Sequence, residues 1–75
     1  MTATTVDLRG LKCPSPLVRL NDTITRIAAG AEFVAVADDR AFEPDVRAWC
    51  ELTGHELVAL EVAGADIHAR IRKQG

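Results

Sequence analysis

The spacing of apolar residues changes along the chain and predicts where strands and helices lie. Residues 4–8 form a short β-branched run that ends before Gly10 and predicts a strand. From Pro14 onward, four apolar residues recur at intervals of three and four, the pattern of an amphipathic helix facing a core: Leu17, Leu20, Ile24 and Ile27. Gly30 supplies the left-handed residue expected just past the end of this helix.

The middle of the chain predicts a second strand and a second helix. Residues 32–37 form an apolar run with little alternation, which is typical of an interior strand covered on part of both faces. Two aspartates then end the strand in a polar turn. A helix over roughly 44–53 is bracketed by Pro44 at its start and Gly54 after its end.

Two alternating segments close the chain and predict a hairpin. Over residues 55–62 one predicted face carries Val58, Leu60 and Val62, and the other carries Leu57, Ala59 and Glu61. Residues 63–66 contain a glycine and predict the turn. The last segment predicts a half-buried strand whose inner face carries Ile67, Ala69 and Ile71.

Together these elements predict an α+β fold in the order β-α-β-α-β-β. The expected architecture is a two-layer α/β sandwich, with a mixed four-stranded sheet and two helices on one face. The other face is left open to solvent or to a partner. A length of 75 residues leaves room for a single domain, residues 1–75, which we expect to be a monomer when isolated.

Composition narrows the range of functions. The chain is 48% hydrophobic and 27% charged, which is typical of a folded globular domain rather than a disordered chain. Three aromatic residues are too few for a platform that stacks single-stranded nucleic acid, so no direct nucleic-acid partner is expected. The apolar stretches are too short to span a membrane, and the first residues lack the features of a signal peptide. The expected location is therefore cytoplasmic.

Charge and cysteine content direct attention to the N-terminal third. Residues 1–30 carry four basic and two acidic side chains, whereas residues 31–66 carry two basic and nine acidic ones. The two cysteines, Cys13 and Cys50, are too few for a disulfide-stapled scaffold. In a reducing compartment each is expected to be a free thiol, either a small core hydrophobe or a nucleophile.

The segment Cys13-Pro14-Ser15-Pro16 is the most informative part of the sequence. Two prolines within four residues are tolerated only in the first turn of a helix, where their missing N–H groups have no intrahelical partner. Cys13 is therefore predicted at or beside the helix N-cap, where the macrodipole favours a thiolate. The nearby Arg9, Lys12 and Arg19 add positive charge around it. The alternative is a half-buried cysteine that merely precedes a helix.

The ten residues Asp7-Leu8-Arg9-Gly10-Leu11-Lys12-Cys13-Pro14-Ser15-Pro16 closely resemble the signature of the TusA-like (SirA/YedF-like) sulfur carrier proteins. The resemblance continues through Ala37-Asp38-Asp39, Trp49-Cys50 and Thr53-Gly54-His55-Glu56-Leu57, and covers about Val6 to Lys73. It implies that Cys13 accepts sulfane sulfur as a persulfide and passes it to an acceptor protein. The relay then serves tRNA thiolation, molybdenum cofactor assembly or sulfur oxidation.

The resemblance also implies the kinds of partner. The donor would be a cysteine desulfurase or a rhodanese-type protein, and the acceptor a DsrE/TusD-like or heterodisulfide-reductase-like protein. Thiol exchange requires no cofactor, and we expect no metal site, because Cys13, Cys50, His55 and His68 have no standard zinc-ligand spacing.

Supporting roles follow for the residues around Cys13. Pro14 and Pro16 would make the helix start rigid, and Gly10 would permit a tight approach from strand to helix. Arg9, Lys12 and Arg19 are candidates for thiolate stabilisation and partner docking, or simply for solvated surface charge. Asp7 would orient the loop or serve as an ordinary acid at the end of a strand.

Other chemistry-bearing residues have simpler interpretations. Cys50 lies on the apolar side of the second predicted helix, as a buried hydrophobe or, alternatively, as a resolving thiol near Cys13. His55 is expected to be structural and His68 to be a surface residue. Asp38 and Asp39 are either a solvated turn or paired carboxylates.

Two other functions are compatible with the sequence. One is a stand-alone thiosulfate sulfurtransferase that uses Cys13, although 75 residues with no evident anion-binding loop leave little room for a substrate pocket. The other is a regulatory interaction module in which the cysteine is incidental. Loss of function on Cys13→Ala with the fold preserved would favour the sulfur carrier over the interaction module.

Overall fold

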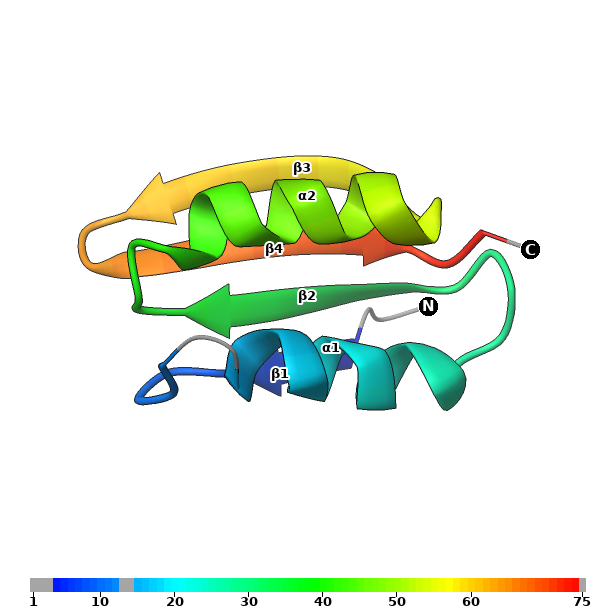
Figure 1. The fold of residues 1–75 in the computed structure, drawn as a ribbon, viewed down its shortest axis with the longest axis horizontal. Helices are drawn as coiled ribbons and strands as arrows, with labels where there is room; N and C mark the ends of the chain where they lie inside the picture. Colours follow the sequence, from blue (N-terminus) through cyan, green and yellow to red (C-terminus); the bar gives the residue numbers. More distant parts are fainter. Residues whose placement is uncertain (1–3, 13–14, 75) are drawn as a thin grey trace.

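The protein consists of four strands and two helices in a computed structural model that describes residues 4–12 and 15–74 (Figure 1). The elements in chain order are β1 (Thr4–Asp7), α1 (Ser15–Thr25), β2 (Glu32–Ala37), α2 (Phe42–Thr53), β3 (Glu56–Ala63) and β4 (Asp66–Arg72). The predicted order of strands and helices is therefore confirmed.

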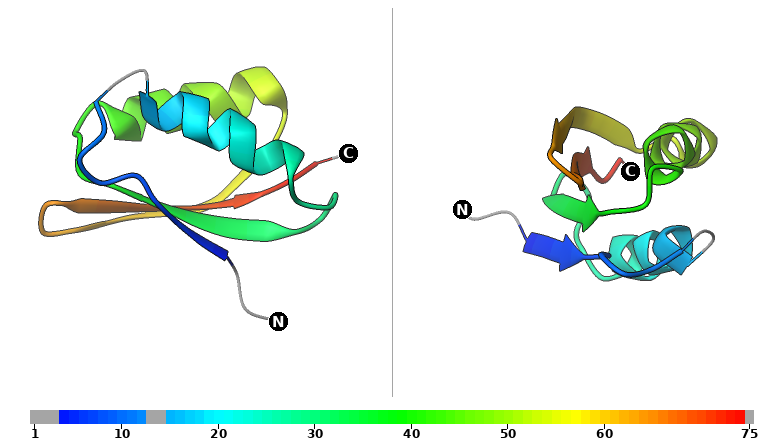
Figure 2. Two further views of the ribbon diagram at one scale, coloured as in Figure 1. Left: turned by 90° about the horizontal axis from the view of Figure 1, so that it is seen from below. Right: turned by 90° about the vertical axis from the view of Figure 1, so that its left-hand side faces the viewer.

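The four strands form one mixed sheet in the order β1-β2-β4-β3. β1 pairs with β2 in parallel, whereas β4 pairs antiparallel with both β2 and β3. Both helices cover the same face of the sheet (Figure 2). The predicted α+β sandwich with one open sheet face is confirmed.

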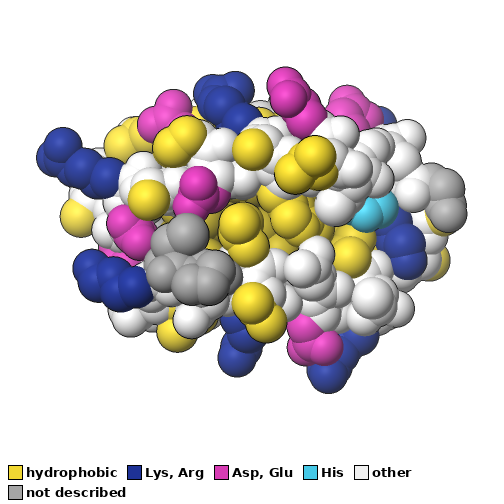
Figure 3. All heavy atoms as spheres, viewed as in Figure 1, with side chains coloured by type: hydrophobic (Ala, Val, Ile, Leu, Met, Phe, Trp, Pro, Cys, Tyr) yellow, Lys and Arg dark blue, Asp and Glu magenta, His cyan; other side chains and the backbone are white. Residues whose placement is uncertain are grey.

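The core lies between the sheet and the two helices. Its largest fully buried side chains are Phe33, Phe42, Leu8, Leu20, Ile71 and Val46. Alternate residues of β2 and β4 face the helices, and several of them are alanines with no exposed surface. From the helix side, apolar side chains follow the space between the helices, and charged side chains surround them (Figure 3). Within the described ranges, neither helix is long and apolar enough to cross a membrane.

The first helix ends earlier than the apolar spacing predicts. α1 stops at Thr25, so Ile27 and Gly30 lie beyond it. Near this end the hydroxyls of Thr23 and Thr25 donate to main-chain carbonyl oxygens, a local alternative that favours helix termination. Gly30 does have a positive φ of 85°, but it belongs to the turn before β2, where its N–H donates to the carbonyl of Lys73.

The second helix begins at Phe42, two residues before the predicted start at Pro44. Pro44 is the third residue of α2 and still lies in the first turn, where a missing N–H costs nothing. The predicted end of this helix is confirmed, because Gly54 adopts a φ of 81° and its N–H donates to the Cys50 carbonyl over 2.9 Å.

The predicted alternation in β3 is wrong at one position because the strand contains a bulge. The pairing with β4 shifts register between Leu57 and Ala59. Leu57 and Leu60 therefore both pack against the core, while Val58 is left exposed between them. An extra residue in one strand of an antiparallel pair produces this reversal of sides.

Candidate functional site

Four segments meet at the end of the sheet where the parallel strands β1 and β2 finish (Figure 1). They are the loop of residues 8–12, the first turn of α1, the start of α2 and the turn between β3 and β4. Both helices run in the same direction, so their N-terminal ends face this edge. The positive ends of two helix dipoles are thus placed together.

Cys13 and Pro14, two residues of the predicted site, lie outside the described residues. The residues that flank them in the sequence lie at this edge of the sheet. Ser15 begins α1, and its N–H donates to the Lys12 carbonyl oxygen over 2.8 Å. Pro16, the second residue of α1, is buried, as a proline in a first helical turn can be.

The loop before Cys13 is attached to β2 at two points. Leu8 is fully buried, and its N–H donates to the Val36 carbonyl over 2.7 Å. Two residues later, the N–H of Gly10 donates to Oδ1 of Asp38 over 3.0 Å. Gly10 has a φ of 84° and open space around the position a Cβ would take. It is therefore needed for its backbone conformation rather than for the close approach that the sequence predicts.

Asp7, the last residue of β1, forms a local ion pair with Arg9 on the loop that follows. The Arg9 backbone N–H and Nε both donate to Oδ1 of Asp7, over 3.1 and 2.9 Å, and Nη2 donates to Oδ2 over 3.1 Å. These bonds lower the pKa of Asp7 to about 2 and raise that of Arg9. Asp66 at the start of β4 adds a second carboxylate 3.9 Å from Arg9 Nη1. Carboxylates therefore compensate the charge of Arg9.

The other two predicted cations are placed differently. Lys12 and Arg19 are exposed, and neither forms an ion pair with any residue in the described part of the chain. Arg19 lines a shallow groove of about 280 Å³ together with Leu11, Ser15 and Val18. Val18 is 60% exposed at the surface of α1. This groove, called the α1 groove below, combines apolar surface with positive charge.

Cys50 lies in the core on α2 and is only 6% exposed. Burial raises the pKa of its thiol from 9.0 to about 11, which keeps it protonated at neutral pH. These surroundings match the interpretation as a buried hydrophobe. They do not suit a nucleophile, which requires an accessible thiolate.

Among the residues that the structure describes, neither histidine belongs to a cluster of metal ligands. His55 packs its ring against Trp49 at a centroid distance of 5.6 Å, and its Nδ1 accepts the Gln74 N–H. His68 lies on the open sheet face, where it lines a shallow hollow with Arg70 and four residues of β2 and β3. Over residues 4–12 and 15–74, no group of three His, Cys, Asp or Glu side chains could hold a metal ion.

The aspartates after β2 are structural partners that sequence reasoning read only as a solvated turn or paired carboxylates. Asp38 holds Gly10, as described above, and Oδ1 of Asp39 accepts the N–H of Ala41 just before α2. The sequence signal that could have revealed the contact with the loop is that these aspartates directly follow β2. An acid that follows a strand parallel to β1 lies beside the loop that leaves β1.

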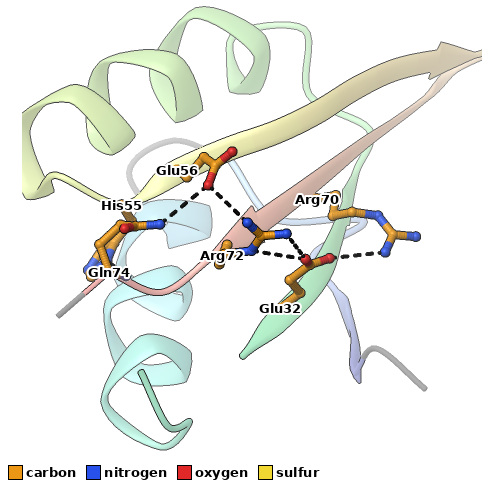
Figure 4. A network of polar contacts seen from close by, with 6 residues as sticks. All are labelled: Glu32, His55, Glu56, Arg70, Arg72 and Gln74. Atoms are coloured by element: carbon orange, nitrogen blue, oxygen red, sulfur yellow. Dashed lines mark hydrogen bonds and ion pairs between the residues drawn. The ribbon is translucent and has the colours of Figure 1, made fainter. Parts of the chain in front are cut away.

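A charged network that the sequence did not predict crosses the opposite end of the sheet (Figure 4). Glu32 on β2 accepts from Arg70 and Arg72 on β4, over 3.2 and 2.5 Å. Arg72 also reaches Glu56 on β3 over 3.4 Å. The Glu32 and Glu56 side chains come from the positions that pair with Arg72 in the sheet. The network therefore joins three strands, away from the candidate site.

Comparison with known proteins identifies the fold and the family. The fold is that of a SirA-like protein from Desulfitobacterium hafniense, whose crystal structure superposes with a TM-score of 0.81 at 22% sequence identity. That match covers 96% of this chain and 99% of the other. A family model described as Sulfurtransferase TusA matches residues 4–73. Proteins of this kind act in sulfur transfer and relay sulfur between proteins. Because the match covers nearly the whole sequence, the chain belongs to the TusA sulfurtransferase family.

Proposed function

We propose that this protein accepts sulfane sulfur as a persulfide on Cys13 and delivers it to an acceptor protein. The observation that carries this proposal is the family match over residues 4–73, which includes the segment Cys13-Pro14-Ser15-Pro16. The second cysteine does not compete for the role, because Cys50 is buried and its thiol has a raised pKa.

The surroundings of the loop support thiolate chemistry. Cys13 follows Lys12 and precedes α1 by two residues, so the N-terminal end of the helix dipole lies close to it along the chain. Positive potential at a helix N-terminus favours the thiolate, which is the nucleophilic form of cysteine. Lys12 and Arg19 add charge that no carboxylate in the described part of the chain neutralises by ion pairing.

The transfer consists of two exchange steps. The Cys13 thiolate attacks the outer sulfur of a donor persulfide, the donor S–S bond breaks, and the donor thiolate leaves. Cys13 now carries the terminal sulfur. An acceptor thiolate then attacks that sulfur, and Cys13 leaves as a thiolate. Each step forms one S–S bond and breaks one, so no external oxidant or reductant is needed.

The α1 groove supports docking of partner proteins at the start of α1, which Cys13 precedes by two residues in the chain. Its apolar lining would accept an aliphatic or aromatic side chain of the partner, and Lys12 and Arg19 would pair with carboxylates around it. The expected donor is a cysteine desulfurase or a rhodanese-type protein. The expected acceptor is a DsrE/TusD-like or heterodisulfide-reductase-like protein.

Intact-protein mass spectrometry after incubation with a cysteine desulfurase and L-cysteine tests the proposal. We expect a gain of one sulfur atom that a reductant removes and that peptide mapping assigns to Cys13. Cys13→Ser should abolish the gain, and the matched variant Cys50→Ala should retain it. Sulfur on Cys50, or none on either cysteine with any donor, would contradict the proposal. Catalytic turnover of thiosulfate and cyanide by the isolated protein would instead indicate a stand-alone sulfurtransferase.

A further inference from the structure

We propose that Asp38 is a positioning residue for sulfur transfer, because its carboxylate fixes the loop that carries Cys13. This inference rests on the function proposed above and extends it to a residue on a different element. Asp38 directly follows β2, and its Oδ1 accepts the N–H of Gly10 over 3.0 Å. The two residues are 28 positions apart in the chain, so the bond joins the loop to a separate part of the fold.

The part of the fold that carries Asp38 is firmly held in the sheet. Asp38 follows Ala37, which has no exposed surface and pairs with Ile67 in the centre of the sheet. On the loop side, Gly10 stands three residues before Cys13, so at most about 10 Å of chain separates their Cα atoms. A displacement of Gly10 is therefore transmitted to Cys13 with little chain to absorb it.

Leu11 packs against the core, but among the hydrogen bonds of residues 8–12 within the described part of the chain, no other bond joins Gly10 to another element. The Leu8 N–H is held by Val36 before the loop leaves the sheet, and the Leu11 N–H returns to Leu8 within the loop. The bonds between Arg9 and Asp7 join residues two positions apart, and they tie the loop to the end of β1, the strand from which the loop leaves, rather than to another element. The contact between Arg9 and Asp66 is longer, at 3.9 Å. Asp38 thus supplies the short bond from the loop tip to another element.

A carboxylate suits this task better than a neutral group. It accepts a backbone N–H in a charge-assisted hydrogen bond, which is shorter and stronger than a neutral one. Gly10 adopts a φ of 84°, a conformation that a flexible glycine does not hold by itself. The bond therefore selects one conformation from those that Gly10 can reach, which is the kind of preorganisation that group transfer requires.

Three variants separate positioning from general stability and from charge. Asp38→Ala removes the acceptor, whereas Asp38→Asn keeps an acceptor oxygen and removes the charge. Asp22→Ala is the control, since Asp22 is an exposed acid on α1 whose carboxylate pairs with Arg26, away from the loop of residues 8–12. Each protein is assayed for the rate of sulfur transfer from a cysteine desulfurase with L-cysteine and for Tm.

We expect Asp38→Ala to slow sulfur transfer about tenfold or more, the size of effect that misplacement of a reacting group produces. Asp38→Asn should restore the rate to within about threefold of wild type. Asp22→Ala should transfer sulfur at the wild-type rate. An Asp38→Ala protein that is folded and transfers sulfur at the wild-type rate would overturn the inference.

The pH profile of Cys13 alkylation by iodoacetamide distinguishes positioning from charge alone. If Asp38 acts only through its negative charge, Asp38→Ala and Asp38→Asn should lower the midpoint of the profile equally. If it positions the loop at the helix dipole, the midpoint for Asp38→Ala should lie above that for Asp38→Asn. Equal midpoints in the two variants would refute the positioning role.

Two further controls distinguish a failure of the proposed function from a failure of the role assigned to Asp38. If the wild-type protein gains no sulfur on Cys13, the proposed function itself fails. If wild type is loaded but Asp38→Ala is loaded equally fast, only the role of Asp38 fails. Should Asp38→Ala not fold, hydrogen exchange of the Gly10 amide in wild type tests the bond directly. We expect protection, and exchange at the rate of an unstructured amide would exclude the bond.

Discussion

At the scale of single residues, we expect the two cysteines to differ in how readily their thiols lose a proton to form a thiolate. Cys50 is surrounded by core side chains, and desolvation raises the pKa of its thiol to about 11. Cys13 lies outside the described residues, two positions before Ser15, the first residue of α1. Burial disfavours the thiolate of Cys50, whereas we expect the helix N-terminus that follows Cys13 in the chain to favour a thiolate there.

This contrast predicts selective alkylation. At pH 7.5 iodoacetamide should modify Cys13 at least about tenfold faster than Cys50, because reactivity follows the thiolate fraction and access. Peptide mapping by mass spectrometry over a time course measures both rates in the same sample. Unfolding in urea should remove the difference. Comparable rates in the folded protein would show that Cys50 is exposed to reagent.

The ion pair of Asp7 and Arg9 predicts a dependence of stability on acid pH. Arg9 lowers the pKa of Asp7 from 3.8 to about 2 in the folded protein, mainly through side-chain hydrogen bonds. The unfolded chain therefore binds more protons over this interval, and stability falls as the pH is lowered from about 4 to about 2. Urea unfolding at several pH values should show a shallower fall for Asp7→Asn than for wild type. Equal slopes would contradict the shifted pKa.

Residue roles could be predicted where they follow from local sequence. The burial of Cys50 follows from helical spacing, and the place of Pro16 in the first turn of α1 follows from proline geometry. The bond between Asp38 and Gly10 could not be predicted in this way, because it depends on which strand lies beside β1. Sequence periodicity assigns residues to faces of an element, but it does not say which elements are neighbours.

At the scale of elements, one polar contact ties the two helices together. The indole Nε1–H of Trp49 on α2 donates to Oδ1 of Asn21 on α1 over 2.8 Å, across 28 residues of sequence. Trp49 is otherwise buried, with 6% of its surface exposed. A buried indole N–H needs an acceptor, so Asn21 completes the packing of α2 against α1.

Loss of this contact should be measurable. Asn21→Ala should lower the free energy of unfolding by about 1 kcal/mol, because it removes the partner of a largely buried donor. Urea unfolding followed by fluorescence is a direct measurement, since Trp49 is the single tryptophan of the chain. The neighbouring variant Asp22→Ala, which removes only an exposed ion pair with Arg26, should cost less than about 0.5 kcal/mol. Equal effects of the two variants would argue against the role of Asn21.

The elements were predictable to the extent that apolar pattern alone defines them. β2 begins and ends where its apolar run does, at Glu32 and Ala37. The predicted end of α1 was wrong because the apolar spacing continues past the last helical residue. The hydroxyls of two threonines near that end donate to main-chain carbonyl oxygens, which favours termination there. Val58 and Leu60 were wrongly predicted to lie on the same face of β3. The bulge that separates them depends on the pairing with β4, which the alternation of apolar and polar residues does not reveal.

At the scale of the whole molecule, the two ends of the sheet have different charge arrangements. At one end Glu32, Glu56, Arg70 and Arg72 neutralise one another across three strands, and the two arginines lower the pKa of Glu32. At the other end, Lys12 before α1 and Arg19 on α1 lack ion-pair partners within the described residues. The end of the molecule that carries the α1 groove therefore keeps two exposed basic side chains that no ion pair within the described residues neutralises.

This asymmetry predicts where a surface substitution will impair transfer. Val18 and Leu52 are both exposed apolar residues on helices, at 60% and 88% exposure, but only Val18 lines the α1 groove. Val18→Glu adds negative charge to a surface that we expect to bind an apolar side chain flanked by carboxylates. It should raise the apparent KM for the partner protein about tenfold or more.

The matched variant Leu52→Glu makes the same chemical change in the last turn of α2, away from the groove. It should leave the KM within about twofold of wild type. Neither substitution should lower Tm appreciably, because both side chains are exposed and glutamate is a good helix former. A steady-state titration with a cysteine desulfurase, measuring persulfide on Cys13, gives KM and kcat for each protein. Equal KM values for the two variants would exclude the α1 groove as the docking surface, whereas a loss of kcat alone in Val18→Glu would indicate that the substitution disturbs Cys13 rather than binding.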